Sequence, residues 1–224
     1  MTAAHLVDRI RWQLRAAAEP ERAAGMQRYM KSAMPYLGVR MPAVRAVVRD
    51  LTKAEPPALQ VIHDAAATLW REAGHREERY AATALTGLPA ARAELSLLPL
   101  HTEMIVTGAW WDHVDGVSGR IGDTLAVHPT AVRPLVISWT TDADLWLRRT
   151  SIICQLGAKG STDLELLSSA IDANLDDREF FIRKAIGWAL RQYARTDPDW
   201  VWRFVTDRAE RISPLSRREA LKHL

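Results

Sequence analysis

The strongest constraint in this sequence is a helical hydrophobic period that runs through nearly all of its 224 residues. Apolar residues recur three and four positions apart in segments of roughly 10–18 residues, the spacing of one face of an α-helix. No segment shows the strict alternation and tight turn of a β-hairpin. Short breaks separate the segments, at 19–20, 38–42, 55–57, 74, 87–89, 99, 128–129, 157–161, 176–177, 197–198 and 213–214. The sequence therefore predicts an all-α protein.

The short breaks also predict how the helices are arranged. Helices of similar length joined by tight turns suit antiparallel pairs stacked side by side, an α-solenoid with a concave face. A compact helical bundle is the alternative, because no strong sequence repeat accompanies the pattern. No linker interrupts the chain, so we expect residues 1–224 to form a single domain. Pro42, Pro57 and Pro198 are expected in first helical turns, and Ser161 or Thr162 is expected to cap the helix that begins near residue 164.

Composition limits the class of protein. Hydrophobic residues make up 48% of the chain and charged residues 25%, which is ordinary for a soluble globular protein. No apolar run is long enough to span a membrane, and the N-terminal segment lacks the apolar stretch of a secretory signal. The one cysteine, Cys154, cannot form an internal disulfide and is expected to be a buried thiol. We therefore expect a protein of the reducing cytoplasm with no membrane partner.

Charge is distributed unevenly along the chain. The formal net charge is +3, but residues 183–224 hold ten Lys and Arg against five Asp and Glu, a net charge of +5. A basic C-terminal quarter favours a polyanionic partner such as nucleic acid, although this signal is weak by itself.

Residues 109–127 form a predicted helix with two distinct faces. Its apolar stripe consists of Trp110, Val114, Val117, Ile121 and Leu125. A second stripe, about 100° away, consists of Trp111, Asp115, Ser118 and Gly122. An indole and a carboxylate one turn apart, on a face away from the core, can hold a cation. The alternative is that Trp111 packs against a neighbouring helix while Asp115 is solvated.

The segment 180–194 predicts a second amphipathic helix. Its buried face is expected to hold Ile182, Ile186, Ala189 or Leu190, and Tyr193. Another face carries Lys184, Trp188, Arg191 and Arg195. Like charges on one helical face are unfavourable in isolation but become favourable opposite a polyanion, and an aromatic residue among cations suits nucleic acid. The alternative is an ordinary solvated basic face.

The segment 145–153 contributes two arginines. Apolar residues lie one turn before and after Arg149, so this guanidinium projects from an apolar surround, whereas Arg148 is the more ordinary surface residue. Arg149 is expected either to form a structural ion pair with a buried carboxylate or to reach an anion such as phosphate.

Motifs for metal, phosphate-loop or serine-nucleophile chemistry do not occur. The seven histidines are scattered, and neither an HExxH spacing nor a GxSxG sequence is present. Any enzymatic activity is therefore expected to need no cofactor and no metal.

Five segments together resemble a known family, the bacterial HEAT-repeat alkylpurine DNA glycosylases, or AlkD-like DNA alkylation repair enzymes. The resemblance extends from about Arg28 to the C-terminus. It rests on RYMKSAMPYLGVRMP (28–42), WWDHVD (110–115), LWLRRTSIICQL (145–156), FFIRKAIGWALRQYARTDPD (180–199) and SPLSRREALKHL (213–224). The WWDHVD and FFIRKAIGW segments are quite specific, and all five occur in the order found in the family.

The resemblance implies a HEAT-like α-solenoid and a set of residues that face the lesion. By motif position these are Trp111, Asp115, Arg149, Trp188 and Tyr29. Arg148 stands where the family more often has a neutral polar residue, so the arginine assignment is ambiguous by one position. Lys184, Arg191 and Arg195 would then hold DNA phosphates without reading sequence.

The implied activity is hydrolysis of the N-glycosidic bond of cationic alkylated purines, N3-methyladenine and N7-methylguanine, in double-stranded DNA. Asp115, Trp111 and Trp188 would form the catalytic group of a monomeric, monofunctional glycosylase that acts on DNA in the nucleoid. The alternative is a non-catalytic HEAT-like protein that binds distorted or branched DNA. The presence of both an indole and a carboxylate favours the enzyme, because binding a polyanion does not require a carboxylate.

Overall fold

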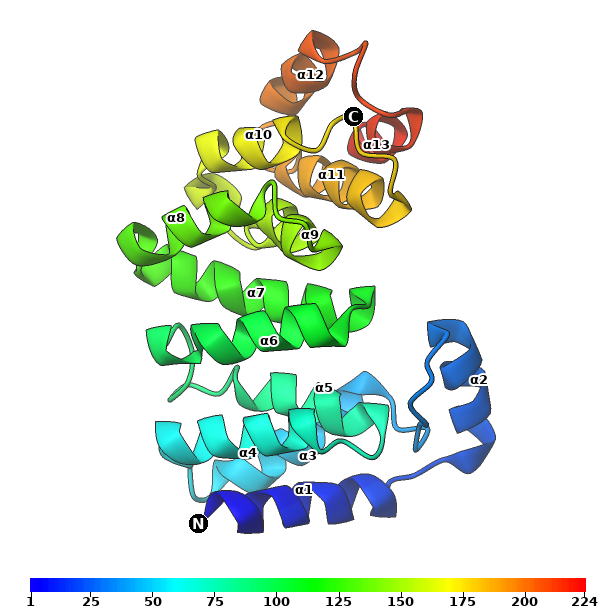
Figure 1. Cartoon of the computed structure of the whole chain (residues 1–224), viewed down its shortest axis with the longest axis vertical. Helices are drawn as coiled ribbons and strands as arrows, with labels where there is room; N and C mark the ends of the chain where they lie inside the picture. The colour runs from blue at the N-terminus through cyan, green and yellow to red at the C-terminus, as the bar shows by residue number, and fades with distance from the viewer. The chain divides into compact units, whose positions relative to one another are not determined.

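The computed structural model describes residues 1–224, and every regular element in it is helical (Figure 1). The helices are α1 (Ala3–Ala16), α2 (Pro20–Met30), α3 (Met41–Lys53), α4 (Leu59–Arg71), α5 (Arg76–Leu85), α6 (Leu98–Gly108), α7 (Trp111–Val127), α8 (Pro129–Trp139), α9 (Leu145–Ile153), α10 (Leu164–Asp172), α11 (Phe180–Tyr193), α12 (Pro198–Asp207) and α13 (Pro214–Ala220), with 3₁₀ turns η1 (Leu95–Leu97) and η2 (Lys159–Ser161). The all-α prediction is confirmed. None of these helices has both the length and the apolar character needed to cross a membrane.

The chain divides into two compact units, Met1–Leu100 and His101–Leu224. In the first unit, α1, α3, α4 and α5 pack against one another, whereas α2 stands apart from them and buries none of its residues. The sequence of α1 explains its packing, because Leu6, Ile10 and Leu14 recur four residues apart and are fully buried.

A buried carboxylate organises the loop that links α2 to α3. Glu77 of α5 is completely buried and accepts backbone N–H bonds from Leu37, Gly38 and Val39 at 2.8–3.1 Å. These charge-assisted bonds satisfy amide groups that would otherwise be buried without partners. The loop that follows the RYMK segment is therefore fixed by the body of the first unit.

The second unit is built as a regular stack of helices. Each helix from α7 to α9 contacts both the next helix and the next but one. The odd-numbered helices form one layer through α7–α9, α9–α11 and α11–α13 contacts, and α8 packs on α10 in the other layer. Neighbour-only packing in two layers is the construction of an α-solenoid.

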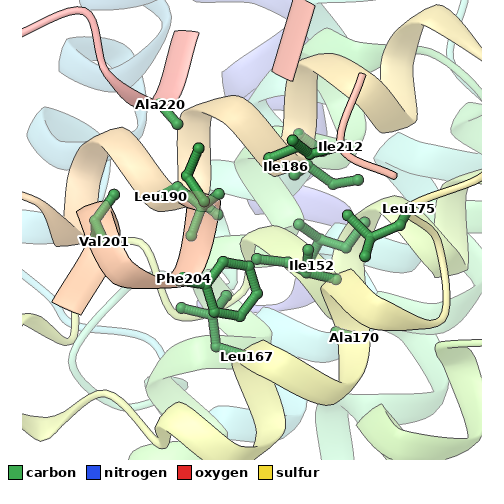
Figure 2. Close-up of a cluster of buried hydrophobic side chains, with 14 of the residues drawn as sticks. Ile152, Leu167, Ala170, Leu175, Ile186, Leu190, Val201, Phe204, Ile212 and Ala220 are labelled. Atoms are coloured by element: carbon green, nitrogen blue, oxygen red, sulfur yellow. The ribbon is translucent and has the colours of Figure 1, made fainter. Parts of the chain in front are cut away.

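The core of the second unit lies where its last helices meet (Figure 2). Ile186 and Leu190 of α11 point into it from one side, and Ile152 of α9 and Phe204 of α12 approach from others. All four side chains are at most 4% exposed. This core fixes α9 and α11 relative to each other, and those two helices carry most of the residues that the sequence singled out.

Three local predictions are wrong in detail. The helix expected from residue 109 begins at Trp111, because Ala109 has a φ of 42° and Trp110 is an extended N-cap. Asp163, and not Ser161 or Thr162, caps α10 by accepting the Leu166 N–H at 2.9 Å. Pro57 lies just before the N-cap of α4 and outside its first turn.

Candidate active site

Asp115 of α7 and Arg149 of α9 form a two-pronged ion pair. Arg149 donates from Nε to Asp115 Oδ1 at 2.8 Å and from Nη2 to Oδ2 at 2.9 Å. Its remaining nitrogen, Nη1, donates to the backbone carbonyl of Phe181 on α11 at 2.6 Å. One guanidinium therefore connects three neighbouring helices of the same layer, with the planar geometry that arginine offers to a carboxylate.

Local sequence brings these two residues together. Asp144 caps α9 by accepting the N–H groups of Trp146 and Leu147, which places Arg149 in the second turn of that helix. On α7, a side chain at Gly122 would collide with the Cys154 carbonyl, so the glycine lets the end of α9 approach closely. Ser118 donates to Thr150 across the same contact at 3.3 Å. Asp115, Ser118 and Gly122 of this stripe therefore face α9, and the prediction that the stripe lies away from the core is wrong for these three residues.

The pair differs in exposure between its two members. The Arg149 side chain is 5% exposed, whereas that of Asp115 is 18% exposed, so the carboxylate is the more accessible member of the pair. Burial raises the pKa of the Asp115 carboxyl above its usual value, and Arg149 opposes this by favouring the ionised form. The nearby Asp112 raises the same pKa further.

Of the alternatives left open for Arg149, the structure contains the ion pair with a buried carboxylate. All three guanidinium nitrogens have protein partners. Arg149 therefore holds Asp115 in place, and each of its three side-chain nitrogens already donates to a protein group.

An aromatic cluster borders the ion pair. The rings of Trp110, Trp146 and Phe181 lie with centroids 5.1–6.2 Å apart. The Arg149 guanidinium carbon lies 6.0 Å from the centroid of the Phe181 ring. Sequence reasoning missed Phe181, although its place beside Phe180 in the first turn of α11 was visible. The cluster lowers the solvent content around Arg149 and so strengthens its bonds to Asp115.

The two tryptophans of interest occupy different positions. Trp111 is the first residue of α7, one turn before Asp115, and is half-buried. Trp188 of α11 is also half-buried and packs against the core shown in Figure 2. The prediction that Trp188 lies on a different face of this helix from the buried residues is therefore wrong in part.

Arg148 points away from the ion pair. It donates to the carbonyls of Asp142 and Ala143 at 2.7 and 3.2 Å and to Asp177 at 3.1 Å. This arginine therefore ties the turn before α9 to the turn before α11. Arg149, and not Arg148, is the arginine that pairs with Asp115, and which of the two faces a lesion stays a prediction.

The predicted basic face of α11 is partly neutralised. Glu219 of α13 binds Lys184 at 3.2 Å and also pairs with Arg191, while Arg195 beyond the helix end is exposed. Gly187 permits this, because a Cβ there would lie 2.5 Å from Glu219 Cβ and 2.9 Å from the Ser216 carbonyl oxygen. Lys184 and Arg191 hold the pKa of Glu219 below its usual value.

Comparison with known proteins supplies the family. Residues 10–224 match the model of the DNA alkylation repair enzyme family. The chain belongs to this family. A solved structure of a predicted DNA alkylation repair enzyme from Enterococcus faecalis is similar in sequence and fold, with 32% identity, a TM-score of 0.82, and coverage of 92% of this chain and 96% of that one. No curated protein matches the chain. The resemblance inferred from five sequence segments is thereby confirmed at the level of the family.

Membership in the DNA alkylation repair enzyme family gives the chain a role in repairing alkylated DNA. In this repair enzyme, eight of the nine residues singled out from the sequence lie on or directly after α7, α9 and α11 of the second unit. Tyr29 is the exception, since it lies on α2 of the first unit and is 74% exposed. No group of three or more His, Cys, Asp or Glu side chains is placed to hold a metal ion.

Proposed function

We propose that this chain is a monofunctional DNA glycosylase that hydrolyses the N-glycosidic bond of cationic alkylated purines, N3-methyladenine and N7-methylguanine, in double-stranded DNA. One observation carries the proposal. Asp115 presents a half-buried carboxylate whose position is fixed by two bonds from a buried arginine. Such a carboxylate is a preorganised negative charge, the feature that best stabilises a developing cation.

The proposed reaction uses charge that the lesion already carries. Alkylation at N3 or N7 makes the purine cationic, so the base leaves as a neutral molecule when it takes the electron pair of the glycosidic bond. Positive charge then develops on the deoxyribose, and Asp115 stabilises it as carboxylates do in glycoside hydrolysis. Water adds at the sugar carbon and loses a proton, for which Asp115 is the proposed acceptor. The products are the free base and an abasic site.

The roles of the surrounding residues follow from their contacts. Arg149 is a positioning residue that orients Asp115 through two hydrogen bonds, and its positive charge favours the ionised carboxylate. Trp111 and Trp188 are proposed to contact the cationic base, at about 0.5–2 kcal/mol for each indole. This contact favours a charged lesion over a neutral base.

The proposed DNA contacts do not read sequence. Arg195, Lys184 and Arg191 are proposed to bind phosphates, with Lys184 and Arg191 exchanging Glu219 for phosphate. Arg148 of α9 is proposed to contact the DNA backbone, and Tyr29 of α2 is proposed to contact the DNA as well. A monomer acting on chromosomal DNA in the nucleoid fits these contacts. Lys184, the lysine of α11, pairs with Glu219, so the proposed reaction uses no Schiff base with the sugar.

A second candidate is a non-catalytic protein that binds distorted or branched DNA. One observation favours it. Each nitrogen of the Arg149 guanidinium donates to a protein acceptor, as in an ion pair with a purely structural role. The exposed part of Asp115 favours the enzyme, since a carboxylate facing a polyanion weakens simple binding.

Base release separates the two candidates. Duplex DNA treated with a methylating agent is incubated with the purified protein, and free bases are measured by chromatography. The glycosylase releases N7-methylguanine and N3-methyladenine faster than a protein-free sample, which corrects for spontaneous depurination. Binding of the same duplex without release above that background would establish the non-catalytic candidate.

A further inference from the structure

A pocket lies in the second unit, between the ends of α9 and α11 and the turn η2. It has a volume of about 330 Å³. Its apolar floor is formed by Ile152, Leu156, Leu167 and Ala189. A cavity of this size, with an apolar floor and polar groups around it, can hold a small ligand.

The rim of this pocket is positively charged. Lys159 of η2 and Arg195 after α11 both line it and are exposed, and no acidic residue lines it. Neither cation forms a hydrogen bond or ion pair through its side chain. This contrasts with Lys184 and Arg191 on the same basic face, which Glu219 engages. The pocket therefore attracts an anionic group.

Two neutral polar side chains in the wall remain available to a ligand. Gln192 and the hydroxyl of Tyr193 line the pocket without hydrogen-bond partners. The Tyr193 ring is held edge-on to Trp200, with centroids 5.3 Å apart. Gln155 is different, because its amide already binds both backbone groups of Asp163. An amide that both donates and accepts suits the edge of a nucleobase.

We propose that this pocket binds a nucleoside monophosphate unit, with the base on the apolar floor and the phosphate between Lys159 and Arg195. The apolar floor accepts the flat face of a base, Gln192 and Tyr193 bind its edge, and the two cations neutralise the phosphate. The volume of about 330 Å³ suits one nucleotide unit.

The pocket is distinct from the Asp115 site. Both lie along α11, with Phe181 at the ion pair and Ala189 and Tyr193 at the pocket, which places them about 12–18 Å apart along the helix axis. The assignment does not rest on glycosylase activity, because it concerns binding alone. The nucleotide is either free in solution or part of a DNA strand that extends away from Asp115.

Equilibrium binding of 2′-deoxyadenosine 5′-monophosphate to the full-length protein tests the proposal. We expect saturable binding by the wild-type protein at concentrations of about 1 mM or below. The double variant Lys159→Ala, Arg195→Ala should weaken it by about tenfold or more, as loss of two charge-assisted contacts requires. Gln192→Glu, nearly the same size, should also weaken it, because it removes the amide donor to the base edge and adds a negative charge to a pocket that binds an anion.

The matched control removes two exposed cations elsewhere. Arg203→Ala with Lys222→Ala makes the same change in net charge away from the pocket and should leave binding unchanged. Equal losses in the two double variants would overturn the proposal, as would the absence of saturable binding to a wild-type protein whose circular dichroism is that of a folded helical protein.

Three further ligands define the chemistry. Inorganic phosphate and deoxyadenosine should each bind more weakly than the nucleotide, and decanoate competing as well as the nucleotide would overturn the assignment of a base to the floor. A single-stranded decanucleotide that displaces the nucleotide identifies the ligand as part of a strand. Its failure to do so identifies a free nucleotide. Neither result depends on base excision. Failure of nucleotide binding and failure of the proposed glycosylase function can therefore be told apart.

Discussion

At the scale of single residues, the central feature is one arginine that fixes one carboxylate. Burial disfavours the ionised form of Asp115, and Arg149 favours it, so the net direction of the pKa depends on both. The pKa is raised, which shows that burial outweighs the pairing. The proposed mechanism needs the ionised carboxylate, so activity must depend on pH through this balance.

We expect the rate of base excision to rise with pH as Asp115 ionises. The inflection should lie above 3.8, the ordinary value for an aspartate. Arg149→Gln removes the positive charge that lowers this pKa while keeping an amide donor, so it should move the inflection to higher pH. Single-turnover rates across a pH series, corrected for spontaneous depurination, measure both. An inflection that moves to lower pH in Arg149→Gln would contradict the assigned balance.

The surroundings of Arg149 could be predicted from the sequence, but its partner Asp115 could not. The spacing around Arg149 indicated an apolar surround, which is correct, and left open a structural ion pair. It gave no indication of Asp115 as the partner, 34 residues earlier. Side-chain periodicity describes one helix at a time, whereas this pair depends on Gly122 letting α7 and α9 approach closely.

At the scale of elements, a carboxylate of α13 partly neutralises the positive charge of α11. This residue, Glu219, reaches Lys184 and Arg191 only because Gly187 leaves room for a close helix crossing. The sequence predicted the buried Ile182, Ile186 and Leu190 of α11 correctly. Its basic face was predicted as a set of cations, and the neutralising carboxylate was missed because it comes from another helix.

Gly187→Ala should destabilise the protein by about 1–3 kcal/mol, because the new methyl group collides with Glu219 and the Ser216 carbonyl. The control is Gly119→Ala on α7, where nothing lies within 4 Å of a Cβ. That variant should be stabilised by about 0.5–1 kcal/mol through the helix preference of alanine. Urea unfolding measures both, and equal effects of the two substitutions would refute the close crossing.

Glu219→Gln should increase affinity for undamaged duplex DNA by about two- to fivefold at low salt, because it frees two cations from a partly exposed pair. The gain should shrink as salt rises. Glu210→Gln removes the same charge from an exposed position without an ion pair and is the control. Fluorescence anisotropy with a labelled duplex measures the affinities, and equal gains in both variants would show a net-charge effect only.

At the scale of the whole molecule, the residues assigned to chemistry lie in the second unit, while Tyr29 lies in the first. The helical class could be predicted because periodicity extends along the entire chain. The division into two units could not, because no linker or change of composition marks residue 100. The two units are defined by which helices contact one another in space. Periodicity along the sequence does not describe those contacts.

Binding to undamaged duplex DNA should weaken steeply with salt, as release of counterions from phosphates requires. Arg195→Ala should reduce the slope of log affinity against log salt by about 0.9, the contribution of one phosphate contact. Lys184→Ala should reduce it less, because Glu219 already neutralises part of that charge. Titrations at several salt concentrations measure the slopes, and equal reductions by the two variants would contradict the proposed phosphate contacts.

The role of Asp115 in excision is the central claim, and one variant tests it most directly. Asp115→Asn keeps the size of the side chain and an acceptor for Arg149 but removes the negative charge. Excision of N7-methylguanine from duplex DNA is measured under single-turnover conditions, with circular dichroism and DNA affinity as controls. We predict a loss of about 10²-fold or more, the effect of removing one preorganised electrostatic group, with helical content and affinity near those of the wild-type protein. Excision by a folded Asp115→Asn variant at the wild-type rate would contradict the account.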